Sequence, residues 1–307
     1  MKSKIKWKVG GETIAGGNGK GDKLNQLSCP SEIHVDDEEQ CIYIADSENS
    51  RIVKWKLDGG SDYGEIVAGG NGQGNRIHQL NCPFDVIVDE KNKSLIICDR
   101  HNRRVVRWSL ENTNGEKEIL VENILCWGLM MNENGDLFVS DKENHAVKRW
   151  RKGEIGKGGE GTIVAGGNGR GNKLNQLNWP TYIFIDGEET VYISDFWNNR
   201  VMKWYKGANE GIIVAGGQGQ GNSLNQLNGP MGLVVNEVGD IYVADWVNHR
   251  IMCWSLGSKE GRIVVGGNGS EVGSNQLNCP IGLSFDVENN LYVADQGNHR
   301  IQRFRVD

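Results

Sequence analysis

The sequence predicts an all-β fold in which six four-stranded antiparallel blades close into a propeller. A short apolar strand that ends in aspartate recurs at intervals of 42 to 54 residues, which is the spacing of four-stranded blades. Of the 307 residues 43 are Gly and only 5 are Pro, as expected for tight turns between short strands. No amphipathic segment of useful helical length interrupts the pattern. The recurring strands end at Asp46, Asp99, Asp141, Asp195, Asp245 and Asp295.

Each repeat contains four strands in the same order. A Gly-rich loop such as 165–171 leads through Asn-Gln-Leu-Asn-x-Pro into strand a, exemplified by 232–235. Strand b ends at the recurring Asp, a loop of the form Asp-x-x-Asn-x-Arg follows, and strand c ends in an aromatic residue. A further turn gives strand d, such as 212–215. These runs are short, β-branched and bounded by turn residues, which is typical of strands.

Closure of the ring requires a fourth strand for the sixth repeat. The chain ends after strand c of that repeat, and residues 12–16 have the sequence of a strand d, so we expect them to complete the last blade. Residues 5–9 resemble an additional strand c, either an outer strand beside the closing one or the remainder of a longer array. We expect one domain, 1–307, with blades at roughly 18–68, 71–121, 122–165, 168–215, 218–265, and 268–307 plus 12–16.

Charge and cysteine usage restrict the environment and the partners. The formal net charge is −6, so the protein has no overall attraction for polyphosphate, and DNA is not an expected partner. The seven cysteines include no Cys-x-x-Cys pair, and Cys41, Cys98 and Cys253 lie in apolar strands, which indicates free thiols in a reducing compartment. The first residues lack the apolar stretch of a signal peptide, and no segment could span a bilayer. We therefore expect a cytoplasmic protein without membrane contact.

The recurring polar residues are interpreted as parts of the fold. An Asp at a strand end can accept hydrogen bonds from the following turn and can pair with the Arg that follows in most repeats. His145, His249 and His299 occupy the same loop, without the dense ligand spacing of a metal site. We therefore expect no catalytic residue, no metal ligand and no cofactor.

The loop positions that differ between repeats form the candidate ligand site. The connections from strand d to a and from strand b to c emerge at the same end of a blade, so these positions should surround one mouth of the central channel. Large aromatic residues on loops are typical of binding sites. The candidates are a basic group in repeats two and three, Arg100, His101, Arg103 and Lys142; an aromatic group in repeats four and five, Trp179, Tyr182, Phe196, Trp197 and Trp246; and Trp127, Glu32 and Asp85 near the start of strand a.

Two repeats carry a family resemblance. The segments 248–251 and 298–301 both read Asn-His-Arg-Ile behind Tyr-Val-Ala-Asp, and they resemble NHL repeats. The resemblance covers essentially the whole chain and implies a six-bladed propeller that binds proteins or single-stranded RNA, although one six-bladed relative is a zinc-dependent amidating lyase. The third repeat departs most, because it has Ala146 where others have Arg, Cys126 where others have Pro, and no Gly-rich loop.

These observations predict a non-enzymatic platform that binds a protein or peptide partner through the channel mouth. A first alternative is a single-stranded RNA-binding module, which the aromatic residues beside basic ones favour and the acidic net charge disfavours. A second alternative is a metal-dependent lyase or hydrolase in the central channel, with Glu32 and Asp85 as its acidic residues.

Overall fold

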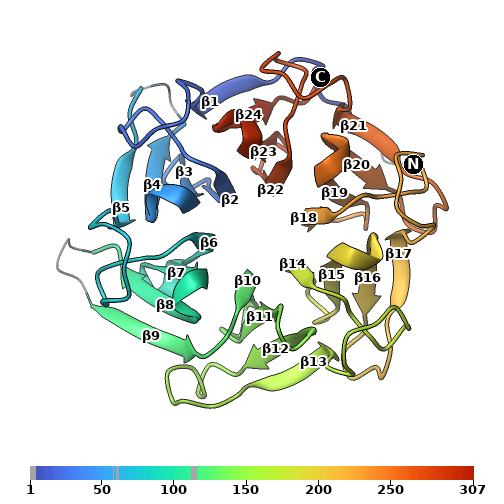
Figure 1. The fold of residues 1–307 in the computed structure, drawn as a ribbon, viewed down its shortest axis with the longest axis horizontal. Helices are drawn as coiled ribbons and strands as arrows, with labels where there is room; N and C mark the ends of the chain where they lie inside the picture. The colour runs from blue at the N-terminus through green and yellow to red at the C-terminus, as the bar shows by residue number, and fades with distance from the viewer. Residues whose placement is uncertain (1–4, 58, 60–61, 112–115) are drawn as a thin grey trace.

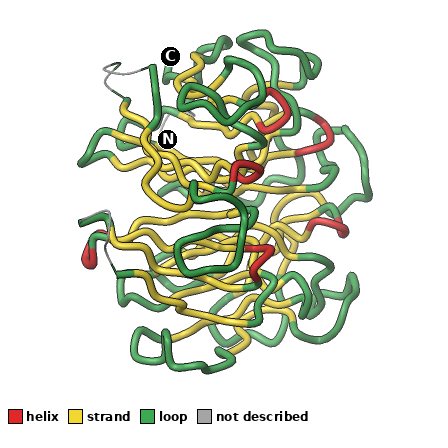
Figure 2. Tube along the Cα trace, turned by 60° about the vertical axis from the view of Figure 1, so that its left-hand side comes forward, coloured by secondary structure: helices red, strands yellow, loops and turns green. Residues whose placement is uncertain are grey.

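The computed structural model describes residues 5–57, 59, 62–111 and 116–307. Within them six four-stranded antiparallel sheets form the blades of a ring, and strand a of every blade lies nearest the centre (Figure 1). The predicted six-bladed propeller is therefore confirmed. Turned by 60°, the trace consists almost entirely of strands and loops, with short single-turn helices (Figure 2). The expected blades 18–68 and 71–121 include residues 58, 60–61 and 112–115, which lie outside the described residues.

The blades follow the order a, b, c, d along the chain. Blade 1 contains β2 (Pro30–Asp36), β3 (Cys41–Asp46), β4 (Arg51–Lys56) and β5 (Glu65–Gly69); blade 2 contains β6 (Pro83–Asp89), β7 (Ser94–Asp99), β8 (Arg104–Ser109) and β9 (Lys117–Glu122); blade 3 contains β10 (Cys126–Met131), β11 (Leu137–Asp141), β12 (Ala146–Trp150) and β13 (Thr162–Gly166). Blade 4 contains β14 (Pro180–Ile185), β15 (Val191–Asp195), β16 (Arg200–Trp204) and β17 (Ile212–Gly216); blade 5 contains β18 (Pro230–Val235), β19 (Ile241–Asp245), β20 (Arg250–Trp254) and β21 (Arg262–Gly266). Blade 6 contains β22 (Pro280–Phe285), β23 (Leu291–Asp295), β24 (Arg300–Phe304) and β1 (Glu12–Gly16).

The position of each strand in its blade explains its composition. Strand b is buried along its whole length, as in β15 and β19, which is why it is a continuous apolar run. Strand d lies at the outside of the ring, and β17 exposes its first two residues. Short 3-10 helices follow strand b in five blades, and one more lies in the a–b turn of blade 2. They are η1 (Ser47–Asn49), η2 (Glu90–Asn92, in the a–b turn), η3 (Arg100–Asn102), η4 (Phe196–Asn198), η5 (Trp246–Asn248) and η6 (Gln296–Asn298). None of the helices in the described ranges is long and apolar enough to cross a bilayer.

The first residues of the chain close the ring, as predicted. β1 pairs antiparallel with β24, and its ends, Glu12 and Gly16, lie opposite Arg303 and Arg300. Gly16 has a φ of +69°, and a Cβ atom there would lie 2.5 Å from the carbonyl oxygen of His299, so a glycine is required at this turn. The last blade is thereby built from both ends of the chain (Figure 1).

Trp7 lies between blades 5 and 6 instead of in an outer strand beside β1. Its ring contacts Tyr242 and Phe285, and its indole N–H donates to the carbonyl oxygen of Asn289 at 2.9 Å. In blades 1 and 4 the tyrosine equivalent to Tyr242 is covered by a lysine of strand c, Lys54 or Lys203. Blade 5 has the short Cys253 at that position, which leaves space for Trp7.

The recurring Asp and Arg residues hold each blade to the loop that precedes it. Asp46 accepts hydrogen bonds from the backbone N–H of Ser28, the Asn49 amide and Nε of Arg51, each at 2.7–2.8 Å. The terminal nitrogens of Arg51 donate to three carbonyl oxygens of the Gly-rich loop, those of Asp22, Lys23 and Gln26. The same contacts recur at Arg104, Arg200, Arg250 and Arg300. Interpreting these residues as parts of the fold was therefore correct.

Blade 3 lacks both the arginine and the Gly-rich loop that form this interaction in the other blades. It has no Gly-rich loop before it, and Ala146 occupies the position of the arginine, so Asp141 pairs with Lys148 at 3.0 Å. Blade 3 therefore lacks the arginine together with the loop carbonyl oxygens to which the arginine donates in the other blades.

The recurring histidines connect neighbouring blades. His145, His249 and His299 each accept, at Nδ1, the backbone N–H of the residue that precedes strand a of the next blade, at 3.0–3.2 Å. The donors are Trp179, Cys279 and Cys29, all with positive φ. These three imidazoles thus stabilise the ring.

Candidate ligand site at the channel mouth

The two sets of loops predicted to surround one mouth do lie at the same end of the ring. The b–c loop of blade 1 donates the backbone N–H of Glu48 to the carbonyl oxygen of Ser28 in the preceding d–a loop. Trp197 and Val247 make the equivalent contact to Asn178 and Asn228 in blades 4 and 5. Hydrogen bonds between loops therefore fix the side chains at this rim.

A cavity of about 220 Å³ opens at this mouth, and its wall is almost entirely apolar. Residues at the first position of strand a after Pro30 and its equivalents form part of the wall, together with b–c loop residues of blades 4 to 6. The lining residues are Phe84, Trp127, Trp179, Phe196, Met231, Trp246, Ile281 and Gln296. We refer to this cavity as the mouth pocket.

Four of the predicted site residues line the mouth pocket, namely Trp127, Trp179, Phe196 and Trp246. Phe84, Met231, Ile281 and Gln296 complete the wall. The repeat alignment predicts Phe84, Met231 and Ile281 around this mouth, at the position of Trp127, although they are not among the candidate site residues. Gln296 occupies the same b–c loop position as Phe196 and Trp246.

The aromatic residues form a continuous series from blade 2 to blade 5. Ring centroids are 4.4 Å apart for Phe84 and Trp127, 5.7 Å for Trp127 and Trp179, and 5.4 Å for Trp179 and Phe196. Trp246 follows at 6.1 Å from Phe196. Such edge-to-face and tilted contacts rigidify a surface that would otherwise be costly to expose.

The solvent exposure of these aromatic residues and of Trp197 beside them is highest at the rim of the mouth. Trp197 at the rim is 54% exposed, whereas Trp127 is only 6% exposed. Trp179, Phe196 and Trp246 are half-buried. The aromatic group is therefore partly a packed layer and partly an accessible surface.

Two cations of the predicted basic group lie on the faces of these rings. The Arg100 guanidinium is 4.1 Å from the centroid of Trp127, and Nζ of Lys142 is 3.6 Å from that of Trp179. Burial lowers the pKa of both, and burial together with nearby Arg100 lowers the pKa of Lys142 to about 8. The basic and aromatic groups that the sequence places in different repeats thus meet in one site.

The other two basic candidates contribute less free charge. Arg103 forms an ion pair with Glu143 at the rim. His101 is exposed on its loop, and desolvation together with the charges of Arg100 and Lys142 lowers its pKa. At neutral pH the unbalanced positive charge beside the pocket therefore comes from Arg100 and Lys142.

Four buried N–H donors at the mouth have no acceptor among the residues that the structure describes. They are Nε of Arg100 and the indole nitrogens of Trp127, Trp179 and Trp246. A buried donor without an acceptor costs free energy, of the order of 1–3 kcal/mol for each group. The site is therefore rich in donors that no group in the described part of the chain satisfies.

Tyr182, Glu32 and Asp85 lie one position further along strand a than the pocket wall, and all three are buried. The Tyr182 hydroxyl donates across the ring, from blade 4 to the carbonyl oxygen of Ser31 in blade 1, at 3.3 Å. Asp85 accepts the backbone N–H of Leu129 at 2.6 Å. Neighbouring strands approach closely here, since a Cβ atom on Gly282 would lie 2.6 Å from the Ser31 carbonyl oxygen.

Burial favours the neutral forms of these two acids. Desolvation raises the pKa values of Glu32 and Asp85, and the Asp85 charge raises that of Glu32 further. Oε2 of Glu32 has no hydrogen-bond partner in the described part of the chain. The structure therefore places these three predicted residues in a buried layer beneath the mouth pocket rather than on its wall.

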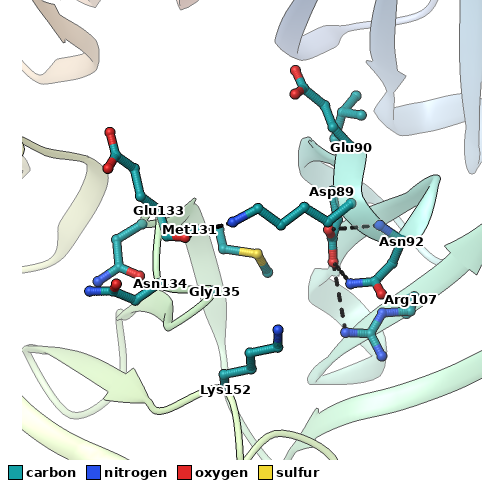
Figure 3. A pocket seen from close by; sticks show the side chains of 12 residues that line it. Asp89, Glu90, Asn92, Arg107, Met131, Glu133, Asn134, Gly135 and Lys152 are labelled. Carbon is teal, nitrogen blue, oxygen red and sulfur yellow. Dashed lines mark hydrogen bonds and ion pairs between the residues drawn. The ribbon is translucent and has the colours of Figure 1, made fainter.

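A larger cavity of about 310 Å³ lies between blades 2 and 3, at their a–b turns (Figure 3). Its charged groups contact one another: Arg107 lies 4.0 Å from Asp89, and Lys91 donates to the carbonyl oxygen of Glu133 at 2.8 Å. None of the predicted site residues lines it. We therefore do not treat it as the candidate site.

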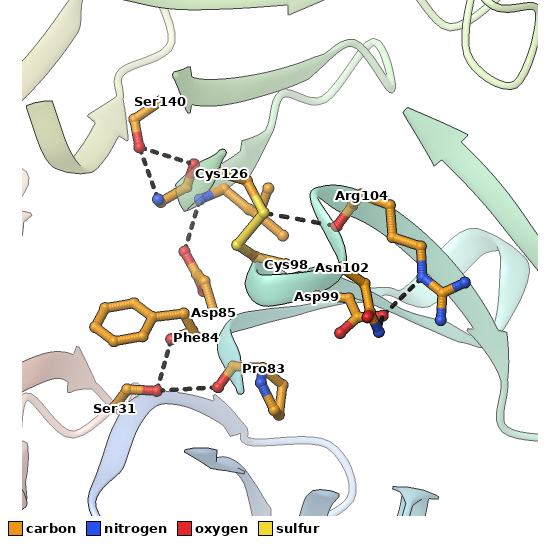
Figure 4. The surroundings of a disulfide bond; sticks show 12 residues. Ser31, Pro83, Phe84, Asp85, Cys98, Asp99, Asn102, Arg104, Cys126 and Ser140 are labelled. Carbon is orange, nitrogen blue, oxygen red and sulfur yellow. Dashed lines mark hydrogen bonds and ion pairs between the residues drawn. A yellow bond between two sulfur atoms is a disulfide. The ribbon is translucent and has the colours of Figure 1, made fainter. Parts of the chain in front are cut away.

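A disulfide joins Cys98 in β7 to Cys126 at the start of β10, linking blades 2 and 3 (Figure 4). The expectation of free thiols is therefore wrong for these two residues. Cys126 occupies the position that Pro has in the other repeats, and the turn between blades brings it within bonding distance of a strand-b cysteine. The other five cysteines form no disulfide within the described residues: Cys29, Cys41, Cys82, Cys253 and Cys279. Cysteine usage consequently no longer supports a reducing compartment.

No group of three His, Cys, Asp or Glu side chains within the described ranges could hold a metal ion. Glu32 and Asp85 stand with a tyrosine and backbone groups as neighbours, which is an incomplete ligand set for zinc.

Comparisons with known proteins identify the repeat and the fold. The NHL repeat family matches residues 227–254 and 277–304, in blades 5 and 6. No curated protein matches the chain in sequence. The crystal structure of an auxiliary nutrient binding protein from Bacteroides thetaiotaomicron has a TM-score of 0.73 at 17% identity, covering 96% of this chain and 76% of that one.

Two enzymes share the architecture. A gluconolactonase from Xanthomonas campestris has a TM-score of 0.64 at 14% identity, covering 93% of this chain and 89% of its own. Virginiamycin B lyase from Staphylococcus aureus has a TM-score of 0.57 at 13% identity, with coverages of 94% and 98%. At such identities the likeness shows the fold alone.

Proposed function

We propose that this chain, a six-bladed β-propeller that contains NHL repeats, is a binding module that takes a protein or peptide partner at its channel mouth. The observation that carries the proposal is the mouth pocket, an apolar cavity surrounded by tryptophans whose N–H groups lack acceptors. Drug-sized ligands occupy pockets of about 300–1,000 Å³. A cavity of about 220 Å³ is suited instead to one side chain of a larger partner.

The rim around the pocket supports this proposal. Aromatic and arginine residues at the centre of a surface supply most of the binding energy in protein interfaces. Here Trp197 and Trp246 stand at the rim and wall, and Arg100 lies on Trp127, which lines the same pocket. The recurring hydrogen bonds hold the loops that carry these residues, so the surface is preorganised for a partner.

Selection of binders from a random peptide library tests the proposal. We expect peptides that bind the wild-type protein and lose binding to the Trp197→Ala/Trp246→Ala variant. The matched control is Tyr205→Ala, which removes a half-exposed aromatic residue away from the mouth. If the selected peptides bind both variants as well as the wild type, the mouth is not the binding surface.

Stability must be measured on the same variants. Trp197 is exposed and its ring contacts those of Trp179 and Phe196 at the mouth, so Trp197→Ala should change the free energy of unfolding by less than about 1 kcal/mol. Trp204 is a buried core residue, and Trp204→Ala should cost about 3–5 kcal/mol. A large loss of stability in the mouth variant would mean that its tryptophans are core residues.

Single-stranded RNA is the second candidate, favoured by the stacking of Arg100 and Lys142 on tryptophans. A titration with random single-stranded RNA at several salt concentrations tests it, because phosphate contacts give a steep salt dependence. No binding at low salt would eliminate this candidate. The metal-dependent lyase or hydrolase is a weaker candidate, because its acids Glu32 and Asp85 are buried; elemental analysis for zinc tests it.

A further inference from the structure

The charge around the mouth pocket restricts which side chains it can accept. Of the b–c loop cations in the described residues, only Arg100 and Lys142 have neither a carboxylate nor a carbonyl partner. Glu143 is paired with Arg103, and Glu48 with Lys20. Asp99, the acid nearest to Arg100 in sequence, is buried against Arg104. Two partly desolvated positive charges thus stand beside an apolar cavity without a counter-charge.

Most of the unpaired hydrogen-bonding groups at the mouth are donors, and the exception is Oδ1 of Asn178 in the d–a loop. Arg100 and the three tryptophans Trp127, Trp179 and Trp246 contribute donors without acceptors. Two of these tryptophan faces already carry a cation, Arg100 on Trp127 and Lys142 on Trp179. A cationic ligand, which would otherwise suit a tryptophan cage, meets occupied faces and like charge here.

We infer that the mouth pocket recognises an acidic apolar peptide segment, with one large apolar side chain in the cavity and an adjacent carboxylate held by Arg100 and Lys142. The inference rests on the proposed function and names its ligand. The carboxylate supplies the acceptors and the negative charge that the site lacks. Charge-assisted hydrogen bonds of this kind are stronger than neutral ones, and a planar guanidinium suits a carboxylate.

A peptide fits these observations better than a nucleic acid. The two cations lie next to each other against Trp127, beside a cavity for one side chain, which matches a single anionic group. A single-stranded nucleic acid presents a phosphate at every nucleotide and is bound along a positive groove. The b–c loops of blades 4, 5 and 6 offer aromatic, apolar and neutral polar residues instead: Phe196, Trp197, Trp246, Val247, Gln296 and Gly297.

Three fluorescein-labelled peptides with identical spacing test the inference. The first presents phenylalanine flanked by glutamate, the second replaces each glutamate by glutamine, and the third by lysine. Fluorescence polarisation with the full chain should show roughly tenfold weaker binding for the glutamine peptide, the effect of about one lost charged hydrogen bond. The lysine peptide should not bind.

Variants of the protein identify the side chains that bind the carboxylate of the peptide. Arg100→Gln and Lys142→Gln should each reduce the ratio of the affinity for the glutamate peptide to the affinity for the glutamine peptide. The exposed Arg170→Gln, on a Gly-rich loop, is the matched control. Melting temperatures verify that each variant is folded, and the peptide comparison on the wild-type protein requires no variant.

The outcomes separate the two proposals. Equal binding of glutamate and glutamine peptides would overturn the inference and leave the binding module standing. A library that yields no mouth-dependent peptide would overturn the proposed function itself. Displacement of the glutamate peptide by oligouridylate, with a steep salt dependence, would overturn the inference in favour of RNA.

Discussion

Each b–c loop contains two kinds of position that differ in what they contact. The Asp, Asn and Arg of the loop are buried or half-buried and make the same hydrogen bonds in five blades, as Asp195, Asn198 and Arg200 do in blade 4. The residues between them, Phe196 and Trp197, have side chains free of these hydrogen bonds, and the pair of residues at these positions varies from blade to blade. The hydrogen bonds of the fold therefore constrain the Asp, Asn and Arg positions of the loop, and the residues between them are available for recognition.

The largest expected effect comes from breaking a constrained position. Arg200→Ala leaves Asp195, which is fully buried, without its ion pair and three loop carbonyls without their donor. Removing one partner of a buried pair costs about 3–5 kcal/mol, so urea unfolding should show a loss of that size. Arg170→Ala, an exposed arginine of the preceding loop, is the control. A loss below about 1 kcal/mol would mean that this network contributes little.

The disulfide sharpens the comparison between blade 3 and the others. Blade 3 lacks the Arg–loop network, and the bond from Cys98 to Cys126, which closes a separation of 28 residues, joins it to blade 2. Cys98→Ala/Cys126→Ala should therefore reduce the free energy of unfolding by about 3 kcal/mol. Cys41→Ala, a buried free cysteine, measures the cost of losing a core sulfur alone. Intact-mass analysis with thiol alkylation would contradict the bond if all seven cysteines reacted.

The buried acids beneath the pocket should make stability depend on pH. The folded-state pKa of Glu32 lies above its unfolded value of about 4.5, so the folded protein binds more protons, and stability falls as pH rises from that value. Asp85 and Tyr182 face Glu32, and burial raises the pKa of Asp85 to about 7, so Asp85 adds to this dependence. In Glu32→Gln the amide replaces Oε2, which has no partner, and the loss of stability between about pH 5 and pH 8 should shrink by at least about 1 kcal/mol. An unchanged pH profile would mean that Glu32 is solvated.

A smaller effect is expected on ligand binding. The pKa of Lys142 is about 8, so its charge disappears as pH rises through that value, whereas Arg100 remains charged and His101 is already neutral. The affinity for the glutamate peptide should therefore fall a few-fold between about pH 7 and pH 9, and the affinity for the glutamine peptide should not. Lys142→Arg should abolish this pH dependence. A parallel decline for both peptides would indicate a general change in the protein.

Sequence periodicity was sufficient to predict the ring, because every blade repeats the same strand order and the closing strand ends in Ala-Gly, as β5 and β17 do. The same alignment located the mouth, since the residue after Pro30 and its equivalents must face one opening. It could not show that Tyr182 crosses the ring to Ser31, because that contact joins opposite blades. The disulfide between Cys98 and Cys126 depends on the angle between adjacent blades, which no single repeat contains.

The most direct test of the central claim observes the indole N–H groups themselves. In a two-dimensional ¹H–¹⁵N spectrum, addition of the glutamate peptide should shift the indole signals of Trp127, Trp179 and Trp246, whose donors lack acceptors. The indole signals of Trp150 and Trp204, which donate to Gly159 and Ala208, should stay in place. Shifts confined to tryptophans outside the mouth, with the three mouth signals unchanged, would contradict the account.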